Sequence, residues 1–406
     1  MEQAYKKLLR YVAVPTASCD GSGMHPTTKE QFDLAHMLVK EMKEAGIQDA
    51  HVDDRCYVYG KIPATTGYEG KIKLGFIAHM DTVSDFADHP VKPVIHENYD
   101  GKDLVLGNSG RTLEVKTFPH LSGLEGRTLI TSDGTTILGA DDKAGVAEIM
   151  ALVEKLNEEQ IPHGPLSIGF TPDEEVGEGA DGFDVAHFGA EFAYTVDGGS
   201  EDEIEYENFN ASGAEIVTHG FNVHPGSSKN VMINASLVAM EINEALPKNE
   251  TPRDTEGYEG FYHLCSMEGS VEQARLSYII RDHDKEKFKE RQEILENICR
   301  NMNEKYGQGT VELTIKEQYL NMAEIIRKHF HLIENAKTAM ERAGLQPHVI
   351  PVRGGTDGAR LSFMGLPCPN LGTGSFACHG PYEHATAEGM NHVVDTLAEI
   401  VKLYAE

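Results

Sequence analysis

Three apolar segments of this chain end in a histidine or are followed within three residues by acidic residues, and a helical segment lies between the first two. The apolar segments are Lys71–His79, Leu166–Phe170 and Phe192–Val196. Apolar residues at helical spacing predict helices over Gln31–Ala45 and Gly145–Leu156. Strands that alternate with helices are typical of an α/β domain with a mostly parallel central sheet flanked by helices. Such sheets bind ligands beyond the carboxyl ends of their strands, so these strand ends mark a candidate site.

The pattern changes after about residue 208. The expected elements are strands at Ala214–His219, Phe261–Met267, Gln273–Arg281 and Thr310–Ile315, and helices at Val231–Leu246 and Lys285–Tyr306. This order predicts a small α+β domain of ferredoxin-like type. A long amphipathic helix is then expected over Tyr319–Ala343. We therefore expect a catalytic α/β domain formed by residues 1–208 and 321–406, with a lid domain inserted at 209–320.

Composition narrows the class of protein. A chain of 406 residues is long enough for about two domains. Its net charge of −29 argues against nucleic acid and anionic membranes as partners. The sequence contains no apolar run of membrane-spanning length and no signal-peptide pattern at its start. Six cysteines without CxxC spacing favour reduced thiols and a cytoplasmic location.

The first chemical signal is the His79-Met80-Asp81 motif at the end of the first apolar segment. Side chains two residues apart on an extended backbone point to the same face, so His79 and Asp81 would project together. A neutral imidazole can bind a metal ion while a carboxylate orients its other ring nitrogen. Taken alone, the pair is better explained by a structural histidine, and it supports a metal site only together with the clusters that follow it.

Four further clusters follow along the chain. Asp141 and Asp142 stand before a helix, where a carboxylate can also cap amide groups. Asp173–Glu175 are three successive acids after a strand, and their repulsion would be relieved by a cation or by exposure to solvent. Asp197 follows the next strand, and His379 lies beside a glycine. Nitrogen and oxygen ligands without thiolate suit zinc, cobalt or manganese, and five of them can hold two ions when one carboxylate bridges.

The motifs HMD, GADDKAG, TPDEEVG and VDGG, followed by a late histidine, resemble those of the co-catalytic zinc exopeptidases related to aminoacylase and carboxypeptidase G. The resemblance covers nearly the whole chain through TSDGTTILGADDKAG, FNVHPGSSKN and RGGTDGA, and within the family it points to the tripeptide aminopeptidases. It implies an enzyme with two zinc ions per chain, replaceable by cobalt or manganese. It also implies that the enzyme removes the N-terminal residue from tripeptides, with a small peptide as partner and a homodimer as one option.

The resemblance also implies how the metal ligands are divided. His79 and Asp197 would hold one zinc ion, and Glu175 and His379 would hold the other. Asp141 would bridge the two ions.

Five other residues would act on the substrate or support the ligands, again as the resemblance implies. Asp81 would orient the first histidine ligand, and Glu174 would be the general base. His224 would stabilise the oxyanion, and the surrounding motif FNVHPGSSKN favours this role over that of a surface histidine before a proline. Arg281 and Arg353 could bind the terminal carboxylate of a peptide through bidentate hydrogen bonds, or could be ordinary ion-pair partners.

If His224 and Arg281 belong to the inserted domain, domain closure must assemble the site, with hinges near residues 207–213 and 316–322. Two alternative functions stay open at this point. A related amidohydrolase that cleaves dipeptides, N-acyl amino acids or a C-terminal residue would share the same metal ligands. A non-catalytic metal- or peptide-binding protein should lack the base or a ligand, and this sequence has all of them.

Overall fold

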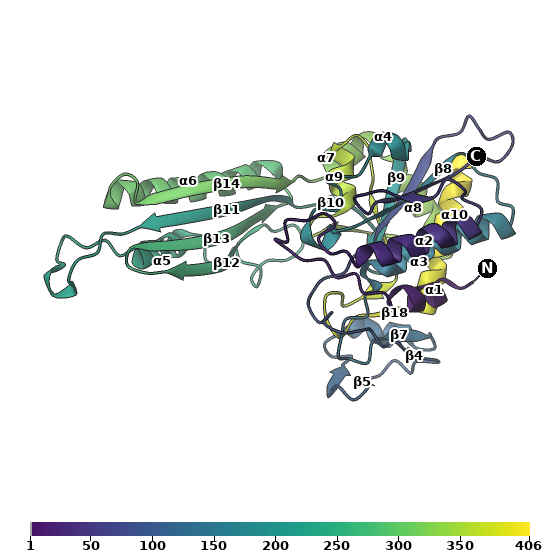
Figure 1. Cartoon of the computed structure of the whole chain (residues 1–406), viewed down its shortest axis with the longest axis horizontal. Helices are drawn as coiled ribbons and strands as arrows, with labels where there is room; N and C mark the ends of the chain where they lie inside the picture. Colours follow the sequence, from purple (N-terminus) through teal and green to yellow (C-terminus); the bar gives the residue numbers. More distant parts are fainter. Residues whose placement is uncertain (1) are drawn as a thin grey trace. The chain divides into compact units, whose positions relative to one another are not determined.

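A computed structural model describes residues 2–406 and divides them into two compact units (Figure 1). The first unit comprises 2–206, Glu324–Ile350 and Thr356–Glu406, and the second comprises Glu207–Ala323 and Pro351–Gly355. From sequence we place the insertion at 209–320, with Pro351–Gly355 outside it. This short segment clusters with the second unit because Arg353 donates to the carbonyls of Gly257 and Glu259 at 2.8 and 2.9 Å.

The first unit is built on an eight-stranded sheet. Its strands are β1 (His51–Val52), β2 (Val58–Ile62), β3 (Leu74–His79), β8 (Leu166–Thr171), β9 (Phe192–Gly198), β10 (Glu203–Asn208), β15 (His348–Val352) and β16 (Asn370–Gly372). They lie in the order β1-β2-β8-β3-β9-β16-β10-β15. The four central strands β8, β3, β9 and β16 run parallel, whereas β1, β2 and β10 pair antiparallel. The predicted α/β class with a parallel central sheet is therefore confirmed.

The helices of this unit are α1 (Ala4–Tyr11), α2 (Gln31–Glu44), α3 (Ala140–Glu158), α4 (Val185–Phe188), α7 (Ala323–Ile326), α8 (His331–Arg342), α9 (Asp357–Phe363) and α10 (Ala387–Ala405). Helix α3 is buried along most of its length because it packs against α1, α10, β3 and β9 (Figure 1). A Cβ atom on Gly145 would lie 1.9 Å from the carbonyl oxygen of Val196, so only glycine allows this close approach to β9. No helix formed by residues 2–406 combines the length and apolar character of a membrane span.

Two smaller sheets complete the first unit and were not expected from the sequence. One has the order β17-β18-β7-β4, from β17 (Ser375–Phe376), β18 (His384–Thr386), β7 (Leu129–Thr131) and β4 (Val94–His96). The other pairs β5 (Leu104–Leu106) with β6 (Arg111–Leu113). Short 3-10 helices are η1 (Pro119–Leu124), η2 (Glu174–Val176) and η4 (Arg327–His329). The hairpin of β17 and β18 is relevant to the candidate site because its connecting loop contains His379, one of the predicted ligands.

The second unit has the chain order β11 (Asn210–His219), α5 (Ala235–Ala245), β12 (Phe261–Gly269), β13 (Gln273–Asp282), α6 (Lys285–Tyr306) and β14 (Val311–Tyr319), with the turn η3 (Pro225–Ser227). Its strands form an antiparallel sheet in the order β12-β13-β11-β14 (Figure 1). This topology is ferredoxin-like, as predicted. Both helices share one apolar core with the sheet, in which Ile242 of α5 and Leu295 of α6 meet Leu276 of β13.

The predicted helix over Val231–Leu246 begins later than expected, at Ala235. The side chain of Asn234 accepts a hydrogen bond from the amide of Leu237 at 3.3 Å and so caps the helix. The preceding residues are therefore outside the helix although their apolar pattern continues.

The prediction of one long helix over Tyr319–Ala343 is wrong. Tyr319 pairs with Ala211 as the last residue of β14. The side chain of Asn321 then accepts the amide of Ala323 at 3.0 Å, where α7 begins. The helical stretch is further divided by η4 before α8. Strand pairing between distant segments decides the start of this stretch, and local periodicity does not contain that information.

Candidate metal centre

The five predicted ligands come from five segments of the first unit that meet at one edge of its central sheet. His79 ends β3, Asp197 lies near the end of β9, and Glu175 follows β8 in η2. Asp141 begins α3, and His379 lies in the loop between β17 and β18. The carboxyl ends of the parallel strands therefore gather residues that are far apart in the sequence.

Asp141 lies between the two histidines. One of its carboxylate oxygens is 3.0 Å from Nε2 of His79, and the other is 3.0 Å from Nε2 of His379. Asp197 is 3.3 Å from the same nitrogen of His79, and Glu175 is 3.2 Å from that of His379. The donor atoms form two groups of three within 4.8 Å, and Asp141 belongs to both groups. This arrangement matches two cation sites that share one carboxylate.

Burial and mutual hydrogen bonds shift the pKa values of the carboxylates and the histidines in this cluster. Burial raises the pKa of Asp197 to about 7, and burial also raises the pKa of Glu175 against the hydrogen bond from His379. Burial alone would raise the pKa of Asp141, but the hydrogen bonds from His379 and His79 outweigh it and lower that pKa. Hydrogen bonds to Asp141 and Glu175 raise the pKa of His379 to about 11. Additional positive charge would stabilise the ionised carboxylates.

The donor set fits divalent metal ions. Oxygen Oε1 of Glu175 is buried and has no hydrogen-bond partner among residues 2–406. A buried carboxylate oxygen without a partner is costly, and a bound cation would satisfy it. Imidazole nitrogen and carboxylate oxygen are suitable ligands for zinc, cobalt or manganese.

Asp81 connects His79 to the pair Glu174–Glu175. Its carboxylate is fully buried and accepts the backbone amides of Glu174 and Glu175 at 2.9 and 3.2 Å. The same carboxylate lies 3.3 Å from Nδ1 of His79, which is also 3.0 Å from the carbonyl oxygen of Asp81. Burial raises the pKa of Glu174 well above its usual value, and the negative charge of Asp197 adds to the shift.

Asp142 has a different role from its neighbour Asp141. Its buried carboxylate accepts the amide of His79 at 3.0 Å and the amide of Gly145 at 3.2 Å. Asp142 therefore fixes backbone, as the capping interpretation of one of the two carboxylates expects.

Sequence reasoning assigned no role to Asp173 or Glu383, both of which are buried. Asp173 has a left-handed backbone with φ of 59°. Its carboxylate accepts the amide of Thr27 at 2.9 Å and the side-chain amide of Gln31 at 2.7 Å, and Nδ1 of His25 lies 3.1 Å away. The acidic run around Asp173 was visible in the sequence, but its distant partners were not. Nothing local singles out Glu383.

The remaining candidates, His224, Arg281 and Arg353, belong to the second unit. His224 is exposed, and its Nδ1 accepts a backbone amide two residues further on at 3.1 Å. Arg281 is buried, and its Nη1 donates to the carbonyl of Ser212 at 3.1 Å. Nη2 of Arg353 donates to the hydroxyl of Thr255 at 2.9 Å, while its Nη1 donates to backbone carbonyls.

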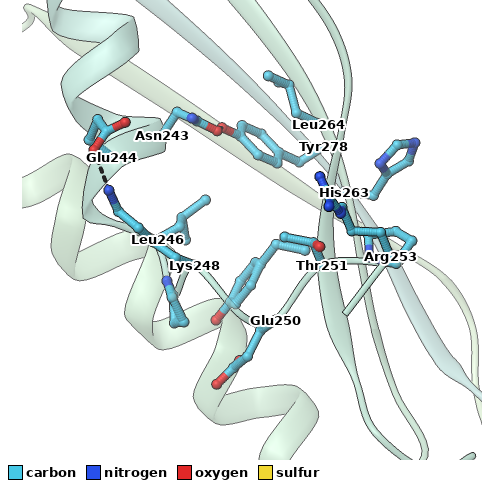
Figure 2. Close-up of a pocket in the computed structure, with 13 residues that line it drawn as sticks. Asn243, Glu244, Leu246, Lys248, Glu250, Thr251, Arg253, His263, Leu264 and Tyr278 are labelled. Carbon is cyan, nitrogen blue, oxygen red and sulfur yellow. Dashed lines mark hydrogen bonds and ion pairs between the residues drawn. The ribbon is translucent and has the colours of Figure 1, made fainter. Parts of the chain in front are cut away.

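The second unit also contains a pocket of about 480 Å³ (Figure 2). Its walls come from the end of α5, the loop that follows, and strands β12 and β13. Glu244 pairs with Lys248 at 2.7 Å, and the hydroxyl of Tyr278 donates to Asn243 at 2.9 Å. None of the candidate site residues lines this pocket. The sequence motifs and the pocket therefore mark different places in the molecule.

Comparison with known proteins identifies the family of this chain. Residues 206–307 match a family model described as a peptidase dimerisation domain. Peptidase T from Clostridium novyi is 51% identical over 409 residues, with 100% of both chains covered. Peptidase T from Listeria monocytogenes is 47% identical over 407 residues, covering 100% of this chain and 99% of that relative. The chain belongs to the peptidase T family.

Membership of the peptidase T family makes the chain a peptidase. Solved structures show the same fold. Aminopeptidase PepT from Bacillus cereus aligns with a TM-score of 0.78 and 22% identity, covering 100% of this chain and 98% of that one. A dinuclear metal binding peptidase of the M20 family from Bacillus subtilis aligns with a TM-score of 0.64 and 15% identity, covering 98% of each chain.

Proposed function

We propose that this member of the peptidase T family is a dizinc aminopeptidase that releases the N-terminal residue from tripeptides. The observation that carries the proposal is the position of Asp141, whose two oxygens each lie 3.0 Å from one histidine. The substrate class is supported by two structures of the same fold, an aminopeptidase from Bacillus cereus and a tripeptidase from Staphylococcus aureus. The Bacillus subtilis structure of this fold is described as binding two metals.

The proposed centre divides its ligands into two sets. His79 and Asp197 would hold one ion, Glu175 and His379 the other, and Asp141 would be shared. Two ions bound there would polarise the scissile carbonyl and lower the pKa of a water molecule toward about 7. We propose zinc because the donor atoms are imidazole nitrogens and carboxylate oxygens, and cobalt or manganese could replace it.

Glu174 is our proposed general base because it lies outside the proposed ligand set. The carboxylate that lies 3.2 Å from His379 belongs to its neighbour Glu175. The backbone amide of Glu174 is held by Asp81 at 2.9 Å, which fixes the position of the residue. A carboxylate outside the ligand set can take a proton from water and return it to the leaving amine.

Residues of the second unit would bind the rest of the substrate. Nδ1 of His224 accepts a hydrogen bond, so a neutral ring carries its proton on Nε2 and can donate it to the oxyanion. Arg281 is our choice for the terminal carboxylate of the peptide. Both terminal nitrogens of Arg353 already donate to oxygens of their own unit, which favours a structural role for that arginine.

Two further parts of the proposal concern assembly and location. A homodimer is supported by the match of residues 206–307 to a peptidase dimerisation domain. A cytoplasmic location is supported by six cysteines that form no disulfide.

The experiment that tests the function is a digest of defined di-, tri- and tetrapeptides, with products identified by mass. A tripeptide with an acetylated N-terminus is the matched control. We expect the free tripeptide to lose its N-terminal residue and the acetylated one to stay intact. A chelator should stop the reaction, and added zinc should restore it. Release of a C-terminal residue or cleavage of the acetylated peptide would point to the amidohydrolase alternative, and chelator-resistant turnover would exclude the metal mechanism.

A further inference from the structure

Glu383 is the last residue of the loop that contains His379, directly before strand β18, and its side chain is buried. One carboxylate oxygen accepts the backbone amide of Gly139 at 2.7 Å, and the other accepts that of Asp141 at 2.9 Å. Its own amide donates to the carbonyl of Gly380 at 3.1 Å. A single residue thus contacts the backbone on both sides of the Asp141–His379 pair.

The contact with Asp141 affects where the shared carboxylate points. Asp141 is at the start of α3 but has non-helical backbone angles, with φ −81° and ψ 106°. Gly139, which precedes the helix, is left-handed with φ 75°. Amides at a helix start lack partners within the helix, and here Glu383 accepts two of them from a position more than 240 residues away. The hydrogen bonds therefore hold the backbone from which the Asp141 side chain extends.

The second contact of Glu383, with Gly380, affects the backbone of the loop that contains His379. Ala377 and His379 are both left-handed, with φ 55° and φ 64°. Non-glycine residues adopt this conformation only where the surroundings hold them in it. The hydrogen bond between Glu383 and Gly380 closes the turn directly after His379. Movement of Glu383 would therefore disturb His379 and Asp141 together.

We infer that Glu383 is a positioning residue that couples the shared carboxylate of Asp141 to the imidazole of His379. The inference rests on the proposed two-metal centre. Groups that orient metal ligands usually change metal affinity by about 10–100-fold when they are altered. Glu383 contacts no substrate in this role and acts through the two ligands.

The test is zinc affinity, measured by titrating the metal-free full chain against a competing chelating dye. E383Q replaces one accepting oxygen by an NH₂ group that faces a backbone N–H. We expect its affinity for at least one of the two ions to fall about 10–100-fold. The matched control is E201Q, because Glu201 is another buried carboxylate of the first unit and accepts a hydrogen bond from Arg127 at 2.6 Å. Its zinc affinity should stay at the wild-type value.

The possible outcomes separate the inference from the proposed function. Wild-type affinity of E383Q for both ions overturns the inference, and so does an equal loss of affinity in E201Q. A wild-type chain that takes up no zinc overturns the metal centre itself. If E383Q does not fold, E383D is titrated instead under the same criteria, since its shorter side chain cannot reach both amides.

Discussion

The carboxylate of Asp81 accepts the backbone amide of Glu174 at 2.9 Å, although the two residues are 93 positions apart. The same carboxylate also accepts the amide of Glu175 at 3.2 Å. Asp81 therefore sets the backbone of both the proposed base and a proposed ligand. It also lies beside His79, so one buried carboxylate contacts the imidazole of one proposed ligand and the backbone of two other proposed site residues.

D81N is expected to lower kcat by about 10–100-fold, because its amide group directs a donor at one of the two backbone N–H groups. Steady-state kinetics with zinc in excess would measure the effect. The comparison variant is D53N, since Asp53 also accepts two backbone amides, those of Arg55 and Tyr57, but both on its Oδ1 at 2.9 Å. Equal losses of kcat in both variants would reduce Asp81 to a residue needed only for folding.

E174Q is expected to keep two zinc ions and to lose about 10²–10⁴-fold in kcat, as removal of a general base does. Its neighbour supplies the control, since E175Q removes a proposed ligand and should release zinc. Metal content by mass spectrometry, together with kcat, distinguishes the two variants. The opposite pattern would mean that the two glutamates have exchanged roles.

H224A is expected to lower kcat by about 10²–10³-fold, because its Nε2–H is the proposed donor to the oxyanion. The value of KM should change much less than kcat. H263A is a suitable control because His263 is another exposed histidine of the second unit. An unchanged kcat in H224A would make His224 an ordinary surface residue.

His384 should make stability depend on pH. Burial lowers the pKa of this residue to about 4, whereas an unfolded histidine titrates near about 6.5. The unfolded chain therefore binds the proton more tightly, and the free energy of unfolding falls as the pH drops from about 6.5 toward 4. Between pH 7 and pH 5 this residue should remove about 2 kcal/mol.

The variant H384F tests this, since phenylalanine can keep the ring contacts of His384 with Phe376 and His120. Urea unfolding at pH 7 and pH 5 would show a smaller loss of stability in the variant. The same loss in wild type and variant would contradict the prediction.

Much of the fold was accessible from sequence because it depends on local periodicity. The alternation of apolar strands with helices predicted the parallel centre of the sheet, and the segments between Asn210 and Tyr319 predicted a ferredoxin-like unit. The prediction failed at Tyr319–Ala343, where pairing of β14 with β11 extends the strand and Asn321 caps the next helix. The small sheet that contains β17 and β18 was also missed, because its strands are only two or three residues long.

The amino-acid sequence by itself determined which residue types stand at the ends of the strands, and therefore the class of chemistry at the sheet edge. Apolar runs fix the strands, and strand ends in a parallel sheet converge whatever lies between them. The family resemblance named Asp141 as the shared ligand, but only the tertiary structure shows the contacts that separate it from Asp142. Asp141 lies beside both histidines, whereas Asp142 accepts backbone amides. These contacts depend on the backbone orientation at the start of α3, where the amides of Gly139 and Asp141 donate to the carboxylate of the distant Glu383.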